Sequence, residues 1–275
     1  MPILTLTSDI GHRDFLVGAI KGQILQVNHS FNIVDISHDL TPFNYPQAAY
    51  VCRNAIRNFP EESFHMVLVN LFHSRPEYLL IARQGHQYLG ISDNGLLSMI
   101  IEGAPDEVVA IQLDRTQNRN TLHCAKVLAE AFTDLLSGKS MDKLGDTSVS
   151  IQVKNPLKPL LGSNYIEGQI IFIDHFENVI VNITREEFEE QRKGRSFKIV
   201  FKRDEVIDKI SESYADVNEG EKLALFNAAS YLEIAINKGN AAGLFGLQGY
   251  SEKSASQTQF LQSRMFYQTV RILFE

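Results

Sequence analysis

The sequence lacks the marks of a secreted or membrane-inserted protein. Its two cysteines, Cys52 and Cys124, are too few for a disulfide framework, so a reducing compartment is expected. The first residues carry no basic flank and no long apolar region, which distinguishes them from a signal peptide. No apolar stretch approaches the roughly 18–20 residues that cross a bilayer. We therefore expect a cytoplasmic protein with no membrane partner.

Several chemical motifs are also missing. No Gly-x-Gly-x-x-Gly follows a predicted strand, no phosphate-binding Gly-x-x-x-x-Gly-Lys-[Ser/Thr] loop occurs, and no Gly-x-Ser-x-Gly elbow is present. The spacings His-x-His and His-Glu-x-x-His are absent as well, so we expect no metal site. The net charge of −7 argues against a nucleic-acid partner, because such partners are held through their phosphates.

What remains is an ordinary globular composition with a change of pattern near the middle. The chain has 275 residues, 44% of them hydrophobic, which suffices for one large or two ordinary domains. Residues 1–155 alternate apolar strands with segments of helical spacing, which predicts an α/β domain with a mostly parallel sheet. Residues 156–165 hold two prolines and a glycine and are typical of a linker. Residues 166–275 hold short β-rich runs and a polar segment, 249–259, expected to be a loop. They predict a small antiparallel barrel or sandwich.

Polar side chains gather where the predicted N-terminal strands end. Ligands of open α/β sheets bind beyond the carboxyl ends of the strands, so a shared site is indicated. A single aspartate at such a place is often a helix N-cap, and for Asp14 capping is an equally good interpretation. His38 or His73 taken alone is more often a structural histidine. In chain order, the polar and aromatic residues at the four strand ends are Ser8, Asp9, His12, Asp14, Ser37, His38, Asp39, Thr41, Phe43, Asn70, His73, Ser74, Arg75, Asp93 and Asn94.

Two polar clusters stand out in the second half. Asp174, Phe176 and Asn178 recur at even offsets, so in a strand they would share one face and could hold a polar small molecule. The alternative is a turn at 175–178 with ordinary capping. Gly239 and Asn240 interrupt an apolar strand, where the glycine either permits a close backbone approach or belongs to a plain hairpin turn.

Five segments together resemble one known family, and they occur in that family's order. They are LTSDIGHRDFLVGAIKG, VDISHDLTPFNYPQAA, SDNGLLS, IDHFENVIVNIT and YLEIAINKGNAA. The family is the S-adenosyl-L-methionine hydroxide adenosyltransferases, to which the fluorinase and chlorinase enzymes are related. The resemblance implies an N-terminal α/β domain, a C-terminal β-barrel and a homotrimer. S-adenosylmethionine would be a substrate, with no cofactor, and would lie between the N-domain of one subunit and the C-domain of its neighbour.

The resemblance also implies roles for individual residues. Asp9 and Asp14 match residues near the methionine and ribose ends, with Asp14 on the ribose hydroxyls, a diol to which a carboxylate can accept twice. Phe43 matches an aromatic wall of the ribose or adenine. The remaining substrate contacts that we carry over are Asp174 and Asn178 toward methionine or adenine, Phe176 stacking on adenine, Asn240 and Ala241 reading the adenine edge, and Cys124 beside the catalytic histidine position.

The catalytic block departs from the family pattern. The hydrolytic enzymes align and activate a water with an Asp-Arg-His set, and this sequence has Asn70 at the aspartate position. Arg75 is the arginine nearby in sequence but stands at a different spacing, while His123 matches the histidine. An asparagine cannot be ionised to act as a base, so His73 or His123 would have to replace it. Otherwise the nucleophile needs no base, or the chain binds S-adenosylmethionine or adenosine without turning it over.

Overall fold

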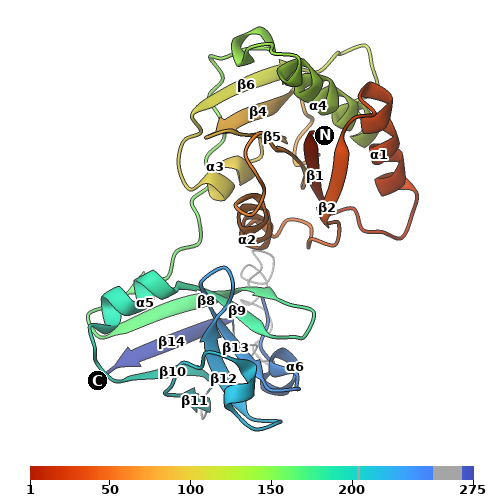
Figure 1. The fold of residues 1–275 in the computed structure, drawn as a ribbon. Helices are drawn as coiled ribbons and strands as arrows, with labels where there is room; N and C mark the ends of the chain where they lie inside the picture. Colours follow the sequence, from red (N-terminus) through yellow and green to blue (C-terminus); the bar gives the residue numbers. More distant parts are fainter. Residues whose placement is uncertain (203–204, 250–267) are drawn as a thin grey trace. The chain divides into compact units, whose positions relative to one another are not determined.

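The computed structural model describes residues 1–202, 205–249 and 268–275, and it divides into two compact units, Met1–Pro156 and Leu157–Glu275 (Figure 1). In the part of the chain that it describes, no helix is both long and apolar enough to cross a membrane.

The N-terminal unit is built on a six-stranded sheet with the order β2-β1-β3-β5-β4-β6. The strands are β1 (Ile3–Ser8), β2 (Asn32–Ser37), β3 (Phe64–Leu68), β4 (Tyr78–Gln84), β5 (Gln87–Ile91) and β6 (Glu107–Gln112). The strands β2, β1, β3 and β5 run parallel, while β4 pairs antiparallel with both β5 and β6. This confirms the predicted α/β domain with a mostly parallel sheet.

Helices cover both faces of this sheet. On one face, α1 (Leu16–Val27) and α4 (Thr121–Leu136) pack together over a core that includes Leu6, Met66 and Phe132. On the other face, α2 (Tyr45–Ile56) and the short α3 (Leu96–Ile101) enclose a second core. Local sequence sets these helices. Asn44 caps α2 ahead of a proline in the first turn, Asn120 caps α4, and α4 ends before Gly138 in the left-handed region.

The C-terminal unit is a nearly closed antiparallel barrel. Its strands follow the order β11-β10-β14-β8-β9-β13-β12, with the short β7 also paired to β8. At the ends of this order β11 and β12 contact each other, and a bridge between Ile210 and Ala224 brings the open edges together. The strands are β7 (Leu160–Leu161), β8 (Tyr165–Ile173), β9 (Val179–Thr184), β10 (Phe197–Lys202), β11 (Glu205–Ile207), β12 (Lys222–Phe226), β13 (Tyr231–Ile236) and β14 (Thr269–Phe274).

Three helical segments complete this unit: α5 (Arg185–Arg192), the 3₁₀ turn η2 (Tyr214–Asp216) and α6 (Ala241–Phe245). One apolar core fills the barrel, with Phe188 of α5 fully buried in it. Residues 156–165, the predicted linker, include β7, which pairs with β8. The predicted polar loop at 249–259 lies outside the described residues from position 250 onward.

Candidate functional site

The four parallel strands of the N-terminal unit end at one edge of the sheet, as the sequence predicts. Because β2, β1, β3 and β5 are adjacent and parallel, their carboxyl ends lie side by side. The segments that follow them begin at His38, Asp9, Val69 and Ser92. The polar residues of these four segments are therefore brought to a common rim.

Asn70 joins all four of these segments. Its backbone N–H donates to Asp9 Oδ2 at 3.0 Å, which ties the end of β3 to the end of β1. Its side-chain Oδ1 accepts from the backbone N–H of Phe43 at 2.8 Å, which ties in the segment after β2. From the end of β5, Asn94 Nδ2 donates to the carbonyls of Val69 and Asn70 at 2.9 and 3.2 Å. Asn70 is thus the hub of the rim.

One atom of this hub has no partner. Asn70 is 5% exposed, and its Nδ2 finds no hydrogen-bond acceptor among the described residues. Its φ of 49° lies in the left-handed region, which asparagine tolerates better than most residues. A buried donor without an acceptor is uncommon in native proteins and points to a water or ligand that would accept from it.

The two aspartates after β1 differ in environment. Burial raises the pKa of Asp9, and the hydrogen bond from the Asn70 N–H partly opposes this shift. Asp14 is exposed, and its Oδ1 accepts from the backbone N–H of Leu16 at 2.8 Å, at the start of α1. Asp14 is therefore not the N-cap of α1, which is Phe15, but it accepts the N–H of the first helical residue from one position earlier. A carboxylate used in this way keeps its second oxygen available to a ligand.

His38 belongs to a buried polar network beneath the rim. Its Nδ1 lies 2.6 Å from Ser8 Oγ and its Nε2 lies 3.2 Å from Asp35 Oδ1. Ser8 and His38 are both fully buried. Burial lowers the pKa of His38, while Asp35 works in the opposite direction. With both ring nitrogens engaged, His38 is the satisfied structural histidine that the sequence allowed, and its carbonyl holds the N–H of Gly11 in the loop between Asp9 and Asp14.

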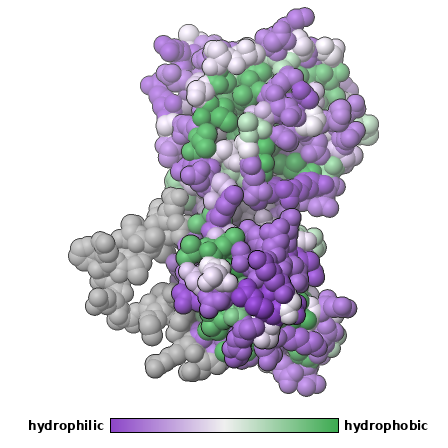
Figure 2. Space-filling model, turned by 90° about the vertical axis from the view of Figure 1, so that its left-hand side faces the viewer, coloured by the Kyte–Doolittle hydropathy of each residue, from purple (hydrophilic) through white to green (hydrophobic). Residues whose placement is uncertain are grey.

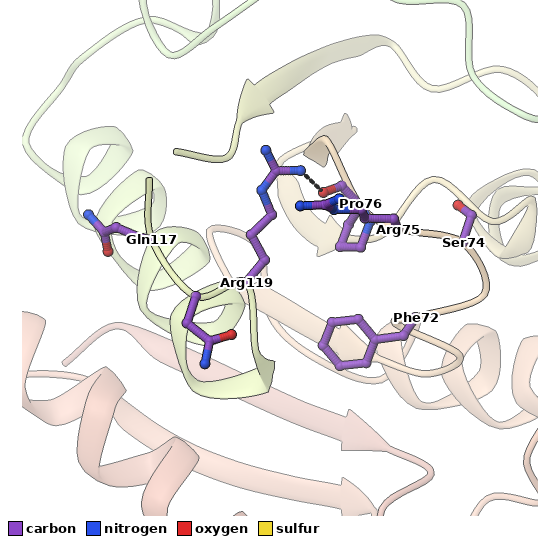
Figure 3. A pocket seen from close by; sticks show the side chains of 7 residues that line it. Phe72, Ser74, Arg75, Pro76, Gln117 and Arg119 are labelled. Carbon is purple, nitrogen blue, oxygen red and sulfur yellow. Dashed lines mark hydrogen bonds between the residues drawn. The ribbon is translucent and has the colours of Figure 1, made fainter. Parts of the chain in front are cut away.

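The loop after β3 lines two cavities. The larger, of about 490 Å³, is bounded by Phe72, Ser74 and Arg75 on one side and by Gln117 and Arg119 on the other (Figure 3). The smaller, of about 170 Å³, contains His73 and also Arg75. His73 is exposed, and its Nδ1 is 3.5 Å from the hydroxyl of Tyr45, a weak contact.

Arg119 is a residue that sequence reasoning missed. Proximity along the chain to Asn70 points to Arg75, yet Arg119, from the segment before α4, lines the same cavity as Arg75. Figure 3 shows its guanidinium extending toward the 72–76 loop, where Nη1 donates to the carbonyl of Pro76 at 2.7 Å. No local motif marks Arg119. It lies directly before Asn120, the N-cap of α4, and only the fold brings it to the 72–76 loop.

His123 and Cys124 lie in the first turn of α4. The backbone N–H of His123 donates to Asn120 Oδ1 at 2.9 Å, and its Nε2 is buried without a partner among the described residues. Cys124 is fully buried in the core beneath α4, and burial raises its pKa to about 11. Its thiol is therefore protonated near neutral pH and packs as a small apolar group.

In the C-terminal unit, Asp174–Asn178 is a turn between β8 and β9, so of the two interpretations of this cluster the structure shows the turn and not the shared strand face. Asp174 Oδ1 accepts from the backbone N–H groups of Phe176 and Asn178 at 2.9 and 2.8 Å, and Asn178 Nδ2 donates to Asp174 Oδ2 at 3.1 Å. The Asp174 carboxylate therefore stabilises the turn through three hydrogen bonds to residues within it. The side chain of Phe176 is left 73% exposed.

The segment around Asn240 leads into α6 and not into the hairpin that was one expectation. Asn240 Oδ1 accepts from the N–H of Gly243 and caps the helix, with Ala241 fully buried behind it. The N–H of Ala242 donates to the carbonyl of Glu177 at 3.0 Å. The structure therefore brings the Asp174 turn and the start of α6 together, which are the two C-terminal clusters that the sequence indicated.

A buried carboxylate nearby was not anticipated. Glu233 on β13 is 3% exposed and accepts from the hydroxyl of Tyr214 at 2.5 Å. Burial raises the pKa of Glu233, and the negative charge of Asp174 adds to the shift. Its position inside a continuous apolar strand gave no sequence signal beyond the charge itself.

The site residues thus fall into separate groups. The rim unites Asp9, Phe43 and Asn70, and the larger cavity takes in Arg75. The Asp174 turn and Asn240 form a group within the C-terminal unit. Among the described residues, no group of three histidine, cysteine, aspartate or glutamate side chains is placed to hold a metal ion.

Comparison with known proteins assigns the family. The model of the SAM hydroxide adenosyltransferase N-terminal domain matches residues 4–145, and that of its C-terminal domain matches residues 168–252. An (R)-S-adenosyl-L-methionine hydrolase of Methanocaldococcus jannaschii is 28% identical over 262 residues, covering 92% of this chain and 95% of that protein. A fluorinase of Nocardia brasiliensis is 26% identical, covering 90% and 94%.

A solved structure shares the fold of this chain. The crystal structure of an uncharacterized conserved protein from Thermotoga maritima superposes with a TM-score of 0.79 at 24% identity, covering 98% of this chain and 99% of that one. Because both domain models match in order and the first alone covers more than half of the chain, the protein belongs to the SAM hydroxide adenosyltransferase family.

Proposed function

We propose that the protein hydrolyses S-adenosyl-L-methionine to adenosine and L-methionine. A water oxygen forms a bond to the ribose C5′ while the C5′–sulfur bond breaks, and the bonding pair leaves with sulfur as the neutral thioether of methionine. The water gives up one proton, so the step needs a group that aligns the water and accepts that proton. The sulfonium is already a good leaving group and requires no acid.

The observation that carries this proposal is the unpartnered, buried Nδ2 of Asn70 at the hub of the rim. This amide can donate to the oxygen of a water or of the substrate, but it cannot remove a proton. His123 supplies what Asn70 lacks, because its Nε2 is also buried and without a partner among the described residues. A neutral imidazole nitrogen accepts a proton near neutral pH. We assign to Asn70 the positioning of the attacking water, and to His123 the acceptance of the proton that this water loses.

The substrate contacts follow from the carried-over residues. Asp9 and Asp14 would hold the polar ribose and methionine groups, and Phe43 would cover the nucleoside. The Asp174 turn and Asn240 would bind the methionine or adenine part of the substrate. We propose that these groups meet across subunits of a homotrimer. Exposed apolar side chains beside the C-terminal cluster, Phe176 at 73% and Leu244 at 66%, support an association. So does the hydrophobic patch visible on the N-terminal unit in Figure 2.

A second candidate function is binding of S-adenosylmethionine or adenosine without turnover. It is favoured by the hydrogen bond that Asn70 Oδ1 accepts from the Phe43 N–H. This bond occupies the side-chain oxygen of Asn70, so the oxygen is not free to accept from a water. An aspartate at this position would have a second oxygen for water, and the amide has none. The two candidates share a ligand and differ only in whether the C5′–sulfur bond breaks.

The experiment is incubation of the purified protein with S-adenosylmethionine, with adenosine and methionine followed by chromatography and binding followed by calorimetry. We compare the wild type with Asn70→Asp, His123→Ala and the control His86→Ala, which changes an exposed histidine in the β4–β5 turn. Sedimentation of the same samples tests the trimer.

Hydrolysis predicts equimolar adenosine and methionine from the wild type and from His86→Ala, with a loss of about 10²-fold or more in His123→Ala. Tight binding without adenosine in the wild type would replace hydrolysis by the binding function. Adenosine from Asn70→Asp alone would identify a catalyst that has decayed at this one position. If the wild type neither binds S-adenosylmethionine nor turns it over, both candidate functions are refuted.

A further inference from the structure

The larger cavity of the N-terminal unit is lined by two guanidinium groups. Arg75 approaches from the loop after β3 and Arg119 from the segment before α4, and the cavity measures about 490 Å³ (Figure 3). The hydroxyl of Ser74 and the side-chain amides of Gln117 and Asn118 line the same space. Every one of these five side chains can donate a hydrogen bond, and none carries a negative charge.

Arg119 is held in place with part of its donor capacity unused. Its Nη1 donates to the carbonyl of Pro76 at 2.7 Å, which fixes the guanidinium against the 72–76 loop. Its Nε is buried and has no acceptor among the described residues. Since a buried donor without an acceptor is costly, the cavity has a specific need for an acceptor atom.

The protein itself does not neutralise the two charges. In the described parts of the chain, no carboxylate lies within 4 Å of Arg75 or Arg119 in an ion pair, although thirteen other such pairs form. The acidic residues nearest in sequence have other partners. Glu77 pairs with Arg115 at 3.8 Å, and Asp114 accepts from Thr116 and Gln117. Two like charges therefore face one small space in a protein whose net charge is −7.

We propose that this cavity is a binding site for a small oxyanion, either a carboxylate or a phosphate-type group. Guanidinium is planar and presents paired N–H donors that match two oxygens of such a group, and it stays charged at all physiological pH values. An oxyanion would satisfy Arg119 Nε and relieve the repulsion between the two arginines. Ser74, Gln117 and Asn118 would complete its shell with neutral donors. A cation is repelled by the same arrangement, and an apolar ligand would leave the donors unsatisfied.

The site does not require that the protein hydrolyse S-adenosylmethionine. Arg75 is common to the cavity and to the carried-over catalytic set, so an oxyanion bound here would lie beside the proposed reaction centre. Arg119 belongs to the oxyanion site alone. Binding of an oxyanion can therefore be tested without substrate and without measuring turnover.

The test uses calorimetry with inorganic phosphate and, separately, with acetate, at constant ionic strength set by chloride so that general screening is the same throughout. The variants are Arg119→Gln and Arg75→Gln. The matched control is Arg115→Gln, which removes the same charge from the same segment but does not line the cavity. We expect saturable binding near one oxyanion per chain, weakened at least about tenfold in each cavity variant and unchanged in the control.

Two results would overturn the proposal: no binding of either oxyanion by the wild type beyond the chloride background, or equal affinities in Arg119→Gln and the wild type. Because loss of the Pro76 contact could disturb folding, circular dichroism is recorded for each variant, and Arg75→Gln gives an independent reading from an exposed residue. A preference for phosphate or for acetate identifies the oxyanion. Displacement by L-methionine would identify it further as an amino-acid carboxylate. If adenosine formation fails in the wild type while phosphate binds, the proposed hydrolysis falls and the oxyanion site stands.

Discussion

The stability of the N-terminal unit should fall steeply in mild acid because of one buried histidine. His65 lies in β3, in the middle of the parallel sheet, and is fully buried. Its Nδ1 is 2.8 Å from Thr5 Oγ1 on the neighbouring strand, and its Nε2 has no partner among the described residues. Burial lowers its pKa from 6.5 to about 4, since the charged imidazolium would sit in apolar surroundings.

The sign and size of the effect follow from proton linkage. A histidine with a lowered pKa binds more protons in the unfolded chain than in the folded one. Its contribution to stability is therefore complete above pH 6.5 and is lost as the pH falls toward 4. The difference between a pKa of 6.5 in the unfolded chain and about 4 in the folded one corresponds to a total loss of about 3.4 kcal/mol in the free energy of unfolding. At about pH 5, with the unfolded histidine almost fully charged, about 2 kcal/mol of this is already lost.

The assay is urea unfolding followed by far-ultraviolet circular dichroism, at about pH 7 and at about pH 5, because the chain contains no tryptophan to serve as a fluorescent probe. The variant His65→Gln keeps a neutral polar side chain beside Thr5 but cannot bind the proton. We expect the wild type to lose about 2 kcal/mol more than His65→Gln between the two pH values. The control His86→Gln changes an exposed histidine and should follow the wild type.

Apart from His65, the wild type and His65→Gln carry the same titrating groups, so these cancel in the comparison. Equal pH dependence in the wild type and His65→Gln would contradict the reasoning, because it would mean that His65 is protonated as easily in the folded as in the unfolded state.

Three further predictions concern other buried polar groups. Arg53→Leu should lower the free energy of unfolding by about 2–3 kcal/mol in thermal melts, because the Arg53 guanidinium donates to the last carbonyls of α3, which would lose their partners. Asn94→Ala should cost about 2 kcal/mol in urea unfolding and should loosen the rim, since Nδ2 no longer donates to the carbonyls of Val69 and Asn70 and Oδ1 no longer accepts from the Leu96 N–H. Glu233→Gln should stabilise the protein near neutral pH, because burial raises the pKa of this carboxyl and the folded state disfavours its charge. The gain should vanish as the pH falls below 4.5, and a constant gain at all pH values would exclude this cause.

Much of the fold could be predicted from the sequence because the signals are local and repeated. The apolar runs at 64–68 and 87–91 become adjacent buried strands, and the apolar spacing of 121–136 becomes the long helix α4. The carboxyl ends of parallel strands must share one edge, so the polar residues after them could be placed together without coordinates. Asp9, Phe43 and Asn70 are linked by hydrogen bonds across that edge.

The parts of the site that could not be predicted depend on side-chain interactions that the spacing of residues along the sequence does not reveal. The even spacing of Asp174, Phe176 and Asn178 is compatible with a strand. However, the Asp174 carboxylate accepts two backbone N–H groups and stabilises a turn, a competition that short polar side chains often win. Asn240 likewise caps a helix where a hairpin was possible. Arg119 could not be found because nothing along the chain connects it to Pro76, whose carbonyl it contacts.

Asn70 stands where the family resemblance predicts an aspartate, and its contacts show that more than a base depends on this position. The residue accepts from Phe43 through Oδ1, while its own N–H donates to Asp9, whose pKa is already raised by burial. A carboxylate at position 70 would keep the first contact, but it would place a negative charge at a residue that is only 5% exposed, and burial makes such a charge harder to form. The amide keeps the contact to the Phe43 N–H without a buried charge, and its Nδ2 offers a donor in place of a base. The rim is therefore a stable scaffold with asparagine at its hub, and a proton acceptor for the proposed hydrolysis has to come from another residue, for which the unpartnered imidazole nitrogen of His123 is the structural candidate.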